Sequence, residues 1–574
     1  MSLSEDRKLS ANSLRRPANL KALGFRTTKG LGQLSGLIGQ ERAVRSVNFG
    51  LSVQSKGYNI FMVGEPGCGR TTYAMNELKR AAASMPAPDD WVYVYNFDDP
   101  SVPLAINLPA GKGRELTKDA ADAVEELKTA LSKAFDNNEF EDSKAHLVKT
   151  FQDEVNSIMD ELRKWAESKN FAIKRTPQGF VNLPLIMAPP VAPQNGDAAE
   201  GEEPKAQEPV LREMQQEEFE KLTEEQQAEL QKASEEISQK TLEKLRLIRE
   251  KEKDLKDKIH ELESQICRVA IAPVMSELRA KYQPNEKLER WLDDFTEDLI
   301  ANFNVFLAAV RDDQADVDFS RYEVNAFVCN NPNEGAPVIS ETNPIYYNLV
   351  GKVDYENRQG NLYTDFRRIT PGAMHRANGG FLLLDADELL RQFMSWDVLK
   401  RVLRYRELSI ENLAEQLGYI PVSSLRPEPI PVDMKVVIVG TPYLYYLLNI
   451  YDPEFSKVFK IKAEFDSEMT RTDESEMQIA RFVAGFVERE GKLHFTAAAV
   501  GEVIEWAARL VEDKNKLSTQ LNKIAEILVE STALAKAEGK RQVGIDHVRK
   551  ALSEKIFRHK PCKRIDITRF VIYN

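Results

Sequence analysis

The segment GEPGCGRTT, at residues 64–72, has the residue types and spacing of a phosphate-binding loop. It follows the apolar run YNIFMV and precedes a predicted helix, which is the strand–loop–helix context that such a loop requires. Glycines let backbone N–H groups turn toward phosphates, and the helix N-terminus adds partial positive charge. Taken alone, the segment is also compatible with a plain strand-to-helix turn. Its predicted nucleotide-binding residues are Gly64, Glu65, Pro66, Gly67, Cys68, Gly69, Arg70, Thr71 and Thr72.

Arg70 stands where such loops normally carry lysine. A lysine bridges the outer phosphates as a compact charge, whereas a guanidinium is longer, planar and differently hydrated. We therefore expect Arg70 to hold phosphates but to place its charge poorly against the γ-phosphate in the transition state. Thr71 is the predicted hydroxyl ligand of a Mg²⁺ ion, with Thr72 beside it.

The second half of the site is predicted where the apolar run of GGFLLLDADELL ends in Asp385. This carboxylate is expected on the Mg²⁺ side of the nucleotide, although a solvated turn residue is the alternative for Asp385 alone. The next position, which normally holds a water-orienting glutamate, is Ala386, and Asp387 and Glu388 are shifted along the chain. A third apolar run, VVIVGTP, places Thr441 where a polar residue would sense the γ-phosphate. Together these positions favour binding of ATP or ADP without efficient turnover.

The composition restricts the classes of function. A chain of 574 residues predicts three or four units at about 100–200 residues each. The net charge of −12 makes nucleic acid an unlikely main partner. The four cysteines are scattered, which favours neither a zinc site nor a disulfide framework, and the histidines form no metal cluster, with His375 interpreted as structural. Without a signal-peptide pattern or an apolar run of about 18–20 residues, we predict a cytoplasmic protein with no membrane association.

Strand patterns enclose a long helical block. Apolar and β-branched runs predict strands at 89–97, 321–329, 379–386 and 434–442, and residues 98–113 are interpreted as a connection broken by proline and glycine. After residue 470 the pattern is helical to about residue 556. This order fits a nucleotide-binding α/β domain, interrupted by a helical arm and followed by a small all-helical domain.

The helical block itself has a recognisable order. Residues 114–168 are periodic, and 171–187 predict a small β-hairpin. Residues 188–210, rich in proline, alanine, glycine and acid, are expected to be disordered. Residues 214–283 carry a heptad-like apolar seam, which predicts an antiparallel arm packed on 114–168; a coiled coil with another protein is the alternative.

The segment PGAMHRANGG, at residues 371–380, closely resembles the segment before the acidic strand in AAA+ modules of Lon-type proteases. The resemblance extends over about residues 15–558 and is closest to one branch, the Lon-related ATP-dependent proteases. The matching stretches are LIGQERAVRSVNFGL (37–51), GYNIFMVGEPGCGRTT (57–72), GFVNLPLI (179–186), EGAPVISETNPIYYNLVGKVDYE (334–356) and YDPEFSKVFKIKAEFD (451–466).

This resemblance implies a fold and an assembly. The implied fold is α/β, a P-loop AAA+ domain with a parallel sheet, interrupted by a long, coiled-coil-like helical insertion and followed by an all-helical lid. ATP or ADP with Mg²⁺, a homo-oligomeric (hexameric) ring and unfolded or damaged protein substrates are implied with it. Tyr346 and Tyr347 would grip substrate in the ring channel, with ordinary packing aromatics as the alternative.

The implied divisions follow the same order. They are a loosely held N-terminal lead-in (1–35), the first part of the AAA+ α/β domain (36–112), the helical arm insertion (113–317), the second part of the α/β domain (318–469), the helical lid (470–556) and a divergent tail (557–574).

Lon-type enzymes cut peptides with a Ser–Lys pair in a domain that follows the lid. The stretch KPCKRIDITRFVIYN after residue 559 does not resemble such a domain, so we expect no Ser–Lys dyad in this chain. The expected function is that of the ATP-binding module of a Lon-like ATP-dependent serine protease, with weakened hydrolysis. The alternative is a non-catalytic, chaperone-like ring that holds unfolded protein.

Overall fold

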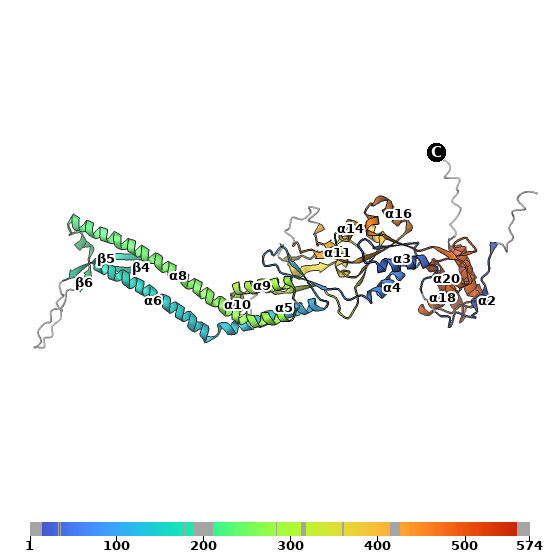
Figure 1. The fold of residues 1–574 in the computed structure, drawn as a ribbon, viewed down its shortest axis with the longest axis horizontal. Coiled ribbons are helices and arrows are strands. Elements are labelled where there is room, and N and C mark those ends of the chain that lie inside the picture. Colours follow the sequence, from blue (N-terminus) through green and yellow to red (C-terminus); the bar gives the residue numbers. More distant parts are fainter. Residues whose placement is uncertain are drawn as a thin grey trace, which may run out of the picture. The chain divides into compact units, whose positions relative to one another are not determined.

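The computed structural model describes residues 14–32, 34, 36–176, 179–188, 210–282, 284–311, 317–358, 361–413 and 425–559 (Figure 1). These form two compact units, one of residues 119–322 and the other of the described residues on either side. The predicted disordered loop lies outside the described residues except for its ends, Ala188 and Val210, and the predicted tail is described only to His559. None of the described helices combines the length and apolarity that crossing a membrane requires.

The predicted parallel sheet is confirmed and has five strands in the order β17-β1-β16-β13-β8. Every neighbouring pair in it is parallel. β1, β13 and β16 are almost completely buried, which explains their continuous apolar sequences. Because β16 lies between β1 and β13, the segments that follow these three strands meet at one edge of the sheet. The strands are β1 (Ile60–Val63), β8 (Val338–Glu341), β13 (Phe381–Asp385), β16 (Lys435–Gly440) and β17 (Ile461–Glu464).

Side chains of β1 alternate between the two faces of this sheet. Ile60 and Met62 belong to the core shared with α3 and α4. Phe61 and Val63 belong to the core on the other face, with α11, α14 and α16 (Figure 1). The strands are therefore covered by helices on both sides. The helices are α3 (Glu41–Ser52), α4 (Arg70–Ala82), α11 (Tyr346–Val350), α14 (Ser395–Tyr405) and α16 (Pro442–Tyr451).

A second, antiparallel sheet has the strand order β3-β2-β7. The strands predicted at 89–97 and 321–329 are β2 and β7, and they pair with each other rather than with the five-stranded parallel sheet. The interpretation of 98–113 as a connection broken by proline and glycine is wrong for its middle, because β3 forms within it. Pro103 and Pro109 flank this strand, so neither removes a backbone donor from the pairing. The strands are β2 (Asp90–Val94), β3 (Leu104–Leu108) and β7 (Val324–Val328).

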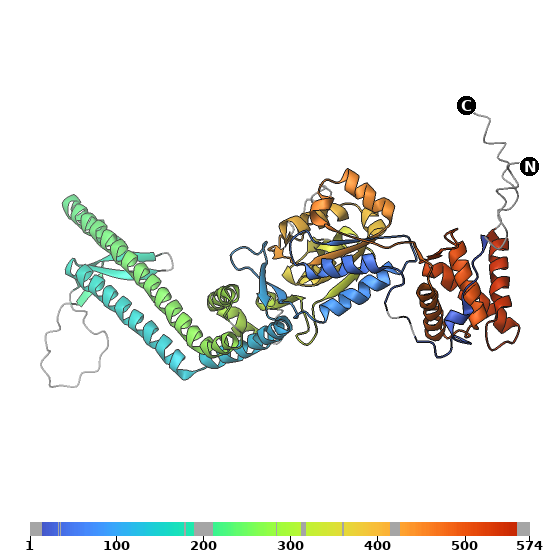
Figure 2. The same ribbon diagram turned by 45° about the vertical axis from the view of Figure 1, so that its right-hand side comes forward.

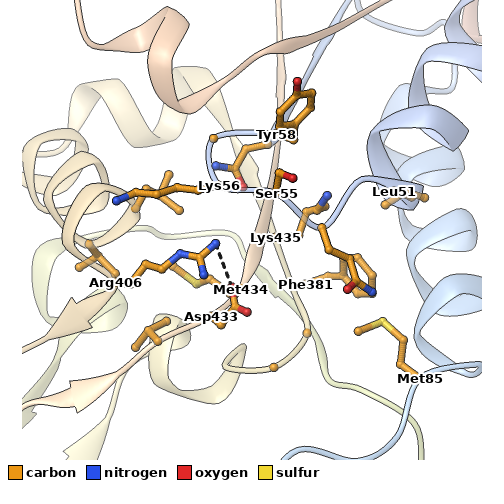
Figure 3. A pocket seen from close by; sticks show the side chains of 18 residues that line it. Leu51, Ser55, Lys56, Tyr58, Met85, Phe381, Arg406, Asp433, Met434 and Lys435 are labelled. Atoms are coloured by element: carbon orange, nitrogen blue, oxygen red, sulfur yellow. Dashed lines mark ion pairs between the residues drawn. The ribbon is translucent and has the colours of Figure 1, made fainter.

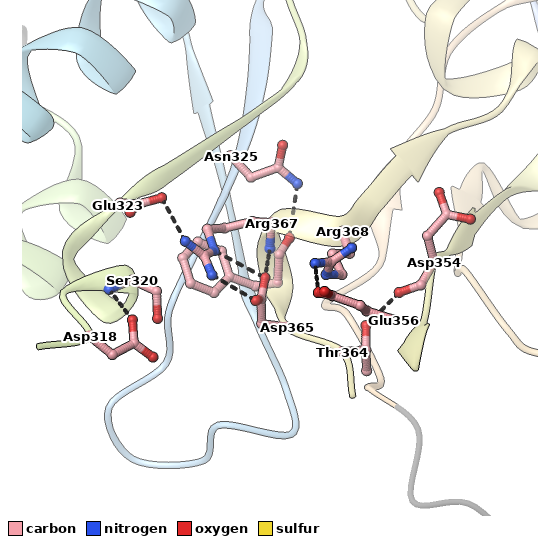
Figure 4. A network of polar contacts seen from close by, with 11 residues as sticks. Asp318, Ser320, Glu323, Asn325, Asp354, Glu356, Thr364, Asp365, Arg367 and Arg368 are labelled. Carbon is pink, nitrogen blue, oxygen red and sulfur yellow. Dashed lines mark hydrogen bonds and ion pairs between the residues drawn. The ribbon is translucent and has the colours of Figure 1, made fainter. Parts of the chain in front are cut away.

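A polar network ties the end of the second sheet to the segment that leads into β13 (Figure 4). Arg367 contacts the carboxylates of both Asp365 and Glu323, at 2.9 Å and 3.0 Å respectively. The hydrogen bonds to Asp365 raise the pKa of Arg367, despite partial burial. The Asn325 amide donates to the carbonyls of Phe366 and Ile369, at 2.9 Å and 3.0 Å. The network therefore fixes the backbone just before the PGAMHRANGG segment.

The helical insertion is confirmed as an arm of paired helices. α6 (Asn138–Ser168) and α8 (Glu224–Ala280) run antiparallel, because Lys144 lies 3.7 Å from Glu263 and Glu161 lies 2.8 Å from Lys244. The predicted hairpin forms as β4 (Phe171–Thr176) and β5 (Gly179–Ala188), and β6 (Val210–Glu213) adds a third strand. The further helices of this region are α5 (Lys112–Phe135), α9 (Glu286–Ala301) and α10 (Phe303–Arg311).

The predicted helical lid forms around one apolar core. The N-terminal segment differs from the expected loose lead-in, because residues 14–32 pack on this core. Leu23 is 3% exposed, and the Thr28 N–H donates to the carbonyl of Phe495 at 2.9 Å. Figure 2 shows this blue segment among the red lid helices. The lid helices are α18 (Asp473–Arg489), α19 (Ala497–Arg509), α20 (Leu521–Ala537) and α21 (Ile545–His559).

Candidate nucleotide-binding site

The glycine-rich loop joins β1 to α4, as the sequence predicts. Gly67 and Gly69 have φ values of +90° and +80°, the left-handed region that favours glycine. Gly69 is also the N-cap of α4, so the helix begins at Arg70. The first N–H groups of a helix have no intrahelical acceptor, and they carry the positive end of the helix dipole. The loop therefore has the form of an anion cradle.

The loop side chains divide into exposed and buried groups. Glu65, Thr71 and Thr72 are exposed, so the Thr71 hydroxyl is accessible to a ligand. Cys68 is 2% exposed, and its Sγ lies 3.8 Å from the hydroxyl of Thr519. Burial raises the pKa of the Cys68 thiol. The cysteine thus anchors the loop to the core, and only its backbone can serve a ligand.

Arg70 turns back toward the sheet. Its guanidinium donates to the carbonyl oxygen of Gly440, the last residue of β16. The N–H of Gly64 donates to the same oxygen at 3.2 Å. Burial lowers the pKa of Arg70, while nearby Asp385 and Glu65 act in the opposite direction. The P-loop cation is therefore fixed at the edge where the three central strands end.

Asp385 and Thr441 lie at this same edge. Within the sheet Val63 pairs with Gly440, and Asp385 pairs with Val439. The Asp385 carboxylate is exposed and caps α13 (Ala386–Arg391), accepting from the N–H groups of Asp387 and Glu388 at 2.9 Å and 3.3 Å. The Thr441 hydroxyl caps α16 in the same way. All three predicted parts of the site are thus neighbours, and their roles toward a nucleotide stay predictions.

Position 386 does not face this edge. Ala386 is 1% exposed, and a Cβ added to Gly440 would lie 2.9 Å from the Ala386 Cβ. Asp387 and Glu388 are half-buried, and each lies 3.8 Å from Arg391. The carboxylates that follow Asp385 are therefore paired on the surface of α13.

The donor set suits a hard cation. The hydroxyl of Thr71 and the carboxylate of Asp385 are oxygen ligands of the kind that Mg²⁺ prefers. Among the described residues, no group of three or more His, Cys, Asp or Glu side chains could hold a metal ion. An ion here would therefore depend on nucleotide phosphates for further oxygen ligands, as is usual for Mg²⁺.

Sequence reasoning missed one residue of the site, Asn522. A Cβ added to Gly67 would lie only 1.9 Å from the Asn522 Oδ1, so the amide rests directly against the glycine. Asn522 is the second residue of α20, in the lid. No motif marks this asparagine, because its place beside the loop follows only from the packing of α20.

Tyr346 and Tyr347 are not free to grip a substrate in this structure. Tyr346 is 7% exposed within the sheet core, and burial raises its pKa to about 12. Tyr347 is half-buried, and its hydroxyl is 3.2 Å from the Oδ1 of Asn412. The alternative of packing aromatics is therefore the right one here.

A cavity of about 280 Å³ lies at the opposite edge of the sheet (Figure 3). Its cations already have protein partners. The Lys435 ammonium donates to the carbonyl of Gly50 at 2.7 Å, near the end of α3. Arg406 lies 3.6 Å from the carboxylate of Asp433. Lys435 thus caps the end of α3 and Arg406 is paired with a carboxylate, and the cavity lies away from the P-loop site.

Three sequence models of Lon families match this chain. The LonB-like AAA domain matches residues 334–466, the archaeal LonB AAA+ ATPase LID domain matches 494–558, and the Lon-like LonC helical domain matches 90–123. The first match contains Asp385 and Thr441 with their strands, and the second contains α19 and α20. This chain carries a Lon-like AAA+ module. The P-loop precedes the first match, so its assignment rests on the sequence motif and the geometry.

Two curated relatives illustrate the extent of this similarity. The archaeal Lon protease of Archaeoglobus fulgidus is 30% identical over 208 residues, covering 35% of this chain and 32% of the relative. That of Thermoplasma acidophilum is 27% identical over 206 residues, covering 35% and 30%. The chain thus spans about a third of the length of these curated relatives.

Solved structures match the Lon-like module only distantly. NtrX from Brucella abortus in complex with ADP is 12% identical, with a TM-score of 0.24. The match covers 51% of this chain and 59% of the NtrX chain. RuvB of Thermotoga maritima is 13% identical, with coverages of 31% and 46% and a TM-score of 0.20. The strand order and register of the sheet, rather than these distant neighbours, define the fold.

Proposed function

We propose that the Lon-like module binds ATP or ADP in the P-loop and hydrolyses ATP very slowly. The observation that carries this proposal is the register of β1, β16 and β13. It brings the loop after Val63, Thr441 and Asp385 to one edge of the sheet. Backbone N–H groups of the loop and of the first turn of α4 would hold the phosphates.

The residues of the site would make different contacts with the nucleotide and its Mg²⁺ ion. Arg70 would give N–H donors to the phosphates, and Thr71 and Asp385 would hold a Mg²⁺ ion, which would neutralise phosphate charge. The exposed Thr72 and Glu65 would line the opening of the loop. Thr441 would fix the end of β16 near the outer phosphate through its cap on α16.

Slow hydrolysis follows from what surrounds the phosphates. Position 386 holds a buried alanine, so no carboxylate follows Asp385 toward the nucleotide. A water-positioning residue is a recurring part of efficient phosphoryl transfer. Asp387 and Glu388 are engaged with Arg391 instead. Binding groups therefore meet at this edge, while the residue that follows Asp385 supplies no group that could activate water.

The test is to measure binding and turnover separately on the full chain. Titration with fluorescent ADP and ATP should give saturable binding, and Thr71→Ala should weaken binding in the presence of Mg²⁺. Phosphate release should stay well below the range of about 1–100 s⁻¹ that is typical of kinases. Turnover in that range would refute slow hydrolysis, and absence of saturable binding would refute the nucleotide site itself.

At the level of the whole protein, we propose that the module works in a cytoplasmic, ring-shaped (hexameric) homo-oligomer that handles unfolded or damaged protein for a Lon-like serine protease. The family matches and the relatives named archaeal Lon protease support this. We also propose the divisions given by the resemblance, with 36–112 and 318–469 forming the α/β domain and 470–556 the lid. The Ser–Lys dyad would lie outside this chain.

The second candidate is a chaperone-like ring without proteolysis, favoured by the buried Ala386 and hence by weak hydrolysis. An unstructured protein such as casein, incubated with the full chain and ATP, tests whether this chain itself cleaves a substrate. Suppressed aggregation without cleavage supports the chaperone-like ring or the module alone. ATP-stimulated cleavage by the purified chain would refute the proposal that its peptidase lies elsewhere. Sedimentation velocity with and without ATP tests the ring.

A further inference from the structure

The carbonyl oxygen of Gly440 receives two donors from the P-loop region, the Gly64 N–H at 3.2 Å and the Arg70 guanidinium. Gly440 ends β16, and the next residue, Thr441, begins the cap of α16. The Thr441 hydroxyl accepts from the Leu444 N–H at 3.4 Å, and its carbonyl accepts from the Tyr445 N–H at 3.2 Å. One residue therefore separates the oxygen held by Arg70 from the first turn of α16.

Arg70 is suited to exchange a carbonyl partner for phosphate oxygens. A guanidinium has five N–H donors in a fixed fork, and it matches phosphate oxygens in a bidentate way. The stem of Arg70 passes beside the start of the loop, because a Cβ on Gly64 would lie 3.1 Å from the Arg70 Cδ. The head group thus lies between the loop that would hold phosphates and the strand end that leads into α16.

One face of α16 is exposed to solvent. Tyr443, Tyr446 and Ile450 are 72%, 51% and 71% exposed, and their spacing of three and four residues places them on one face of the helix. Leu448 faces the core, and Leu444 and Tyr445 of the first turn are partly buried against it. The N–H groups of Leu444 and Tyr445 donate to the two oxygens of Thr441, so the backbone hydrogen bonds of the first turn depend on where Thr441 lies.

We propose that Arg70 is a positioning residue that couples nucleotide occupancy to the first turn of α16. Phosphate oxygens take up the guanidinium donors, the bond to Gly440 is given up, and Thr441 is released with it. The turn that presents Tyr443 and Tyr446 then opens more often. This inference rests on the proposed nucleotide site and adds a regulatory output to it.

The experiment is hydrogen–deuterium exchange on the full chain with and without saturating ADP, with ADP binding measured in the same samples. In the natural chain, ADP should speed exchange of the amides of residues 443–446 several-fold. Arg70→Met keeps a long stem without donors, so these amides should exchange faster even without nucleotide, and ADP should add no further change. Arg391→Met removes an exposed arginine of α13 and should leave the ADP response intact.

The possible results distinguish failure of the proposed coupling from failure of the proposed nucleotide site. ADP binding without a change at residues 443–446 overturns the coupling and leaves the nucleotide site standing. The coupling is also overturned if, without nucleotide, these amides exchange as slowly in Arg70→Met as in the natural chain. The bond from Arg70 to Gly440 would then not stabilise the first turn of α16. If ADP does not bind the natural chain at all, both the site and the coupling are refuted.

Discussion

Ala386 packs directly against Gly440 at the ends of two neighbouring strands. A Cβ on Gly440 would lie 2.9 Å from the Cβ of Ala386 and 2.8 Å from the ring of Phe61. Ala386 itself is 1% exposed. The residue after Asp385 therefore points into the core between β13 and β16, at the position that normally holds a water-orienting glutamate.

We predict that Ala386→Glu will not restore hydrolysis and will destabilise the chain. The new carboxylate would be buried without a cationic partner, which costs about 3 kcal/mol or more. Denaturant unfolding should show the loss, and ATP turnover should stay at the level of the natural chain. Asp387→Ala, on the exposed side of the same helix, is the matched control and should change the unfolding free energy by about 0.5 kcal/mol or less. A stable Ala386→Glu protein with fast turnover would contradict the packing.

The contact of Gly67 with Asn522 predicts a coupled pair of substitutions. Gly67→Ala should lower the free energy of unfolding and weaken nucleotide binding. The left-handed backbone costs about 1–2 kcal/mol for alanine, and the new Cβ collides with the Asn522 amide. Asn522→Gly in the same chain removes the collision and should recover part of the lost stability. A double-mutant cycle on unfolding free energies measures the recovery, and strict additivity would show that the two residues do not touch.

His375 predicts a pH dependence of stability. It is 1% exposed, and burial lowers its pKa to about 3. Between this value and the ordinary histidine pKa of about 6.5, the unfolded chain binds a proton that the folded chain does not. Stability should therefore fall as the pH drops below about 6.5, by up to about 1.4 kcal/mol per pH unit from this group.

His375→Leu should remove that component, which unfolding experiments at several pH values between 7 and 4 would measure. Replacement of the exposed His146 by glutamine serves as the control, because that side chain is open to water. If both variants keep the same slope as the natural chain, His375 is not the group responsible.

The ion pair of Arg471 and Glu476 should be essential to the lid. The two side chains are 1% and 3% exposed and lie 2.7 Å apart, and Glu476 also accepts from the Asn19 N–H at 3.1 Å. Arg471→Met would leave a buried carboxylate without its partner, at a cost of about 3–5 kcal/mol. Arg163→Met breaks an exposed pair with Asp160 and should cost less than about 1 kcal/mol. Equal shifts in the two midpoints of thermal unfolding would argue against this role.

Much of the fold could be predicted because its signals are local. Buried parallel strands leave continuous apolar runs, and these marked β1, β13 and β16. β8 and β17 carried no such run, since two of the four residues of each are polar, including a glutamate. The second sheet was missed as a unit, because the sequence shows which segments are strands but not which strands pair.

The sequence by itself determined the kind of chemistry available to this protein. Glycines at fixed spacing, a neighbouring cation and hydroxyl, and an acidic residue after an apolar strand are properties of short segments, and residue types fix what those segments can donate or accept. Only the tertiary structure decided that Arg70 reaches Gly440, 370 residues away, that Ala386 faces the core and that Asn522 rests on Gly67. These contacts depend on strand order and helix packing, which arise from the burial of the whole apolar core rather than from any single stretch of chain.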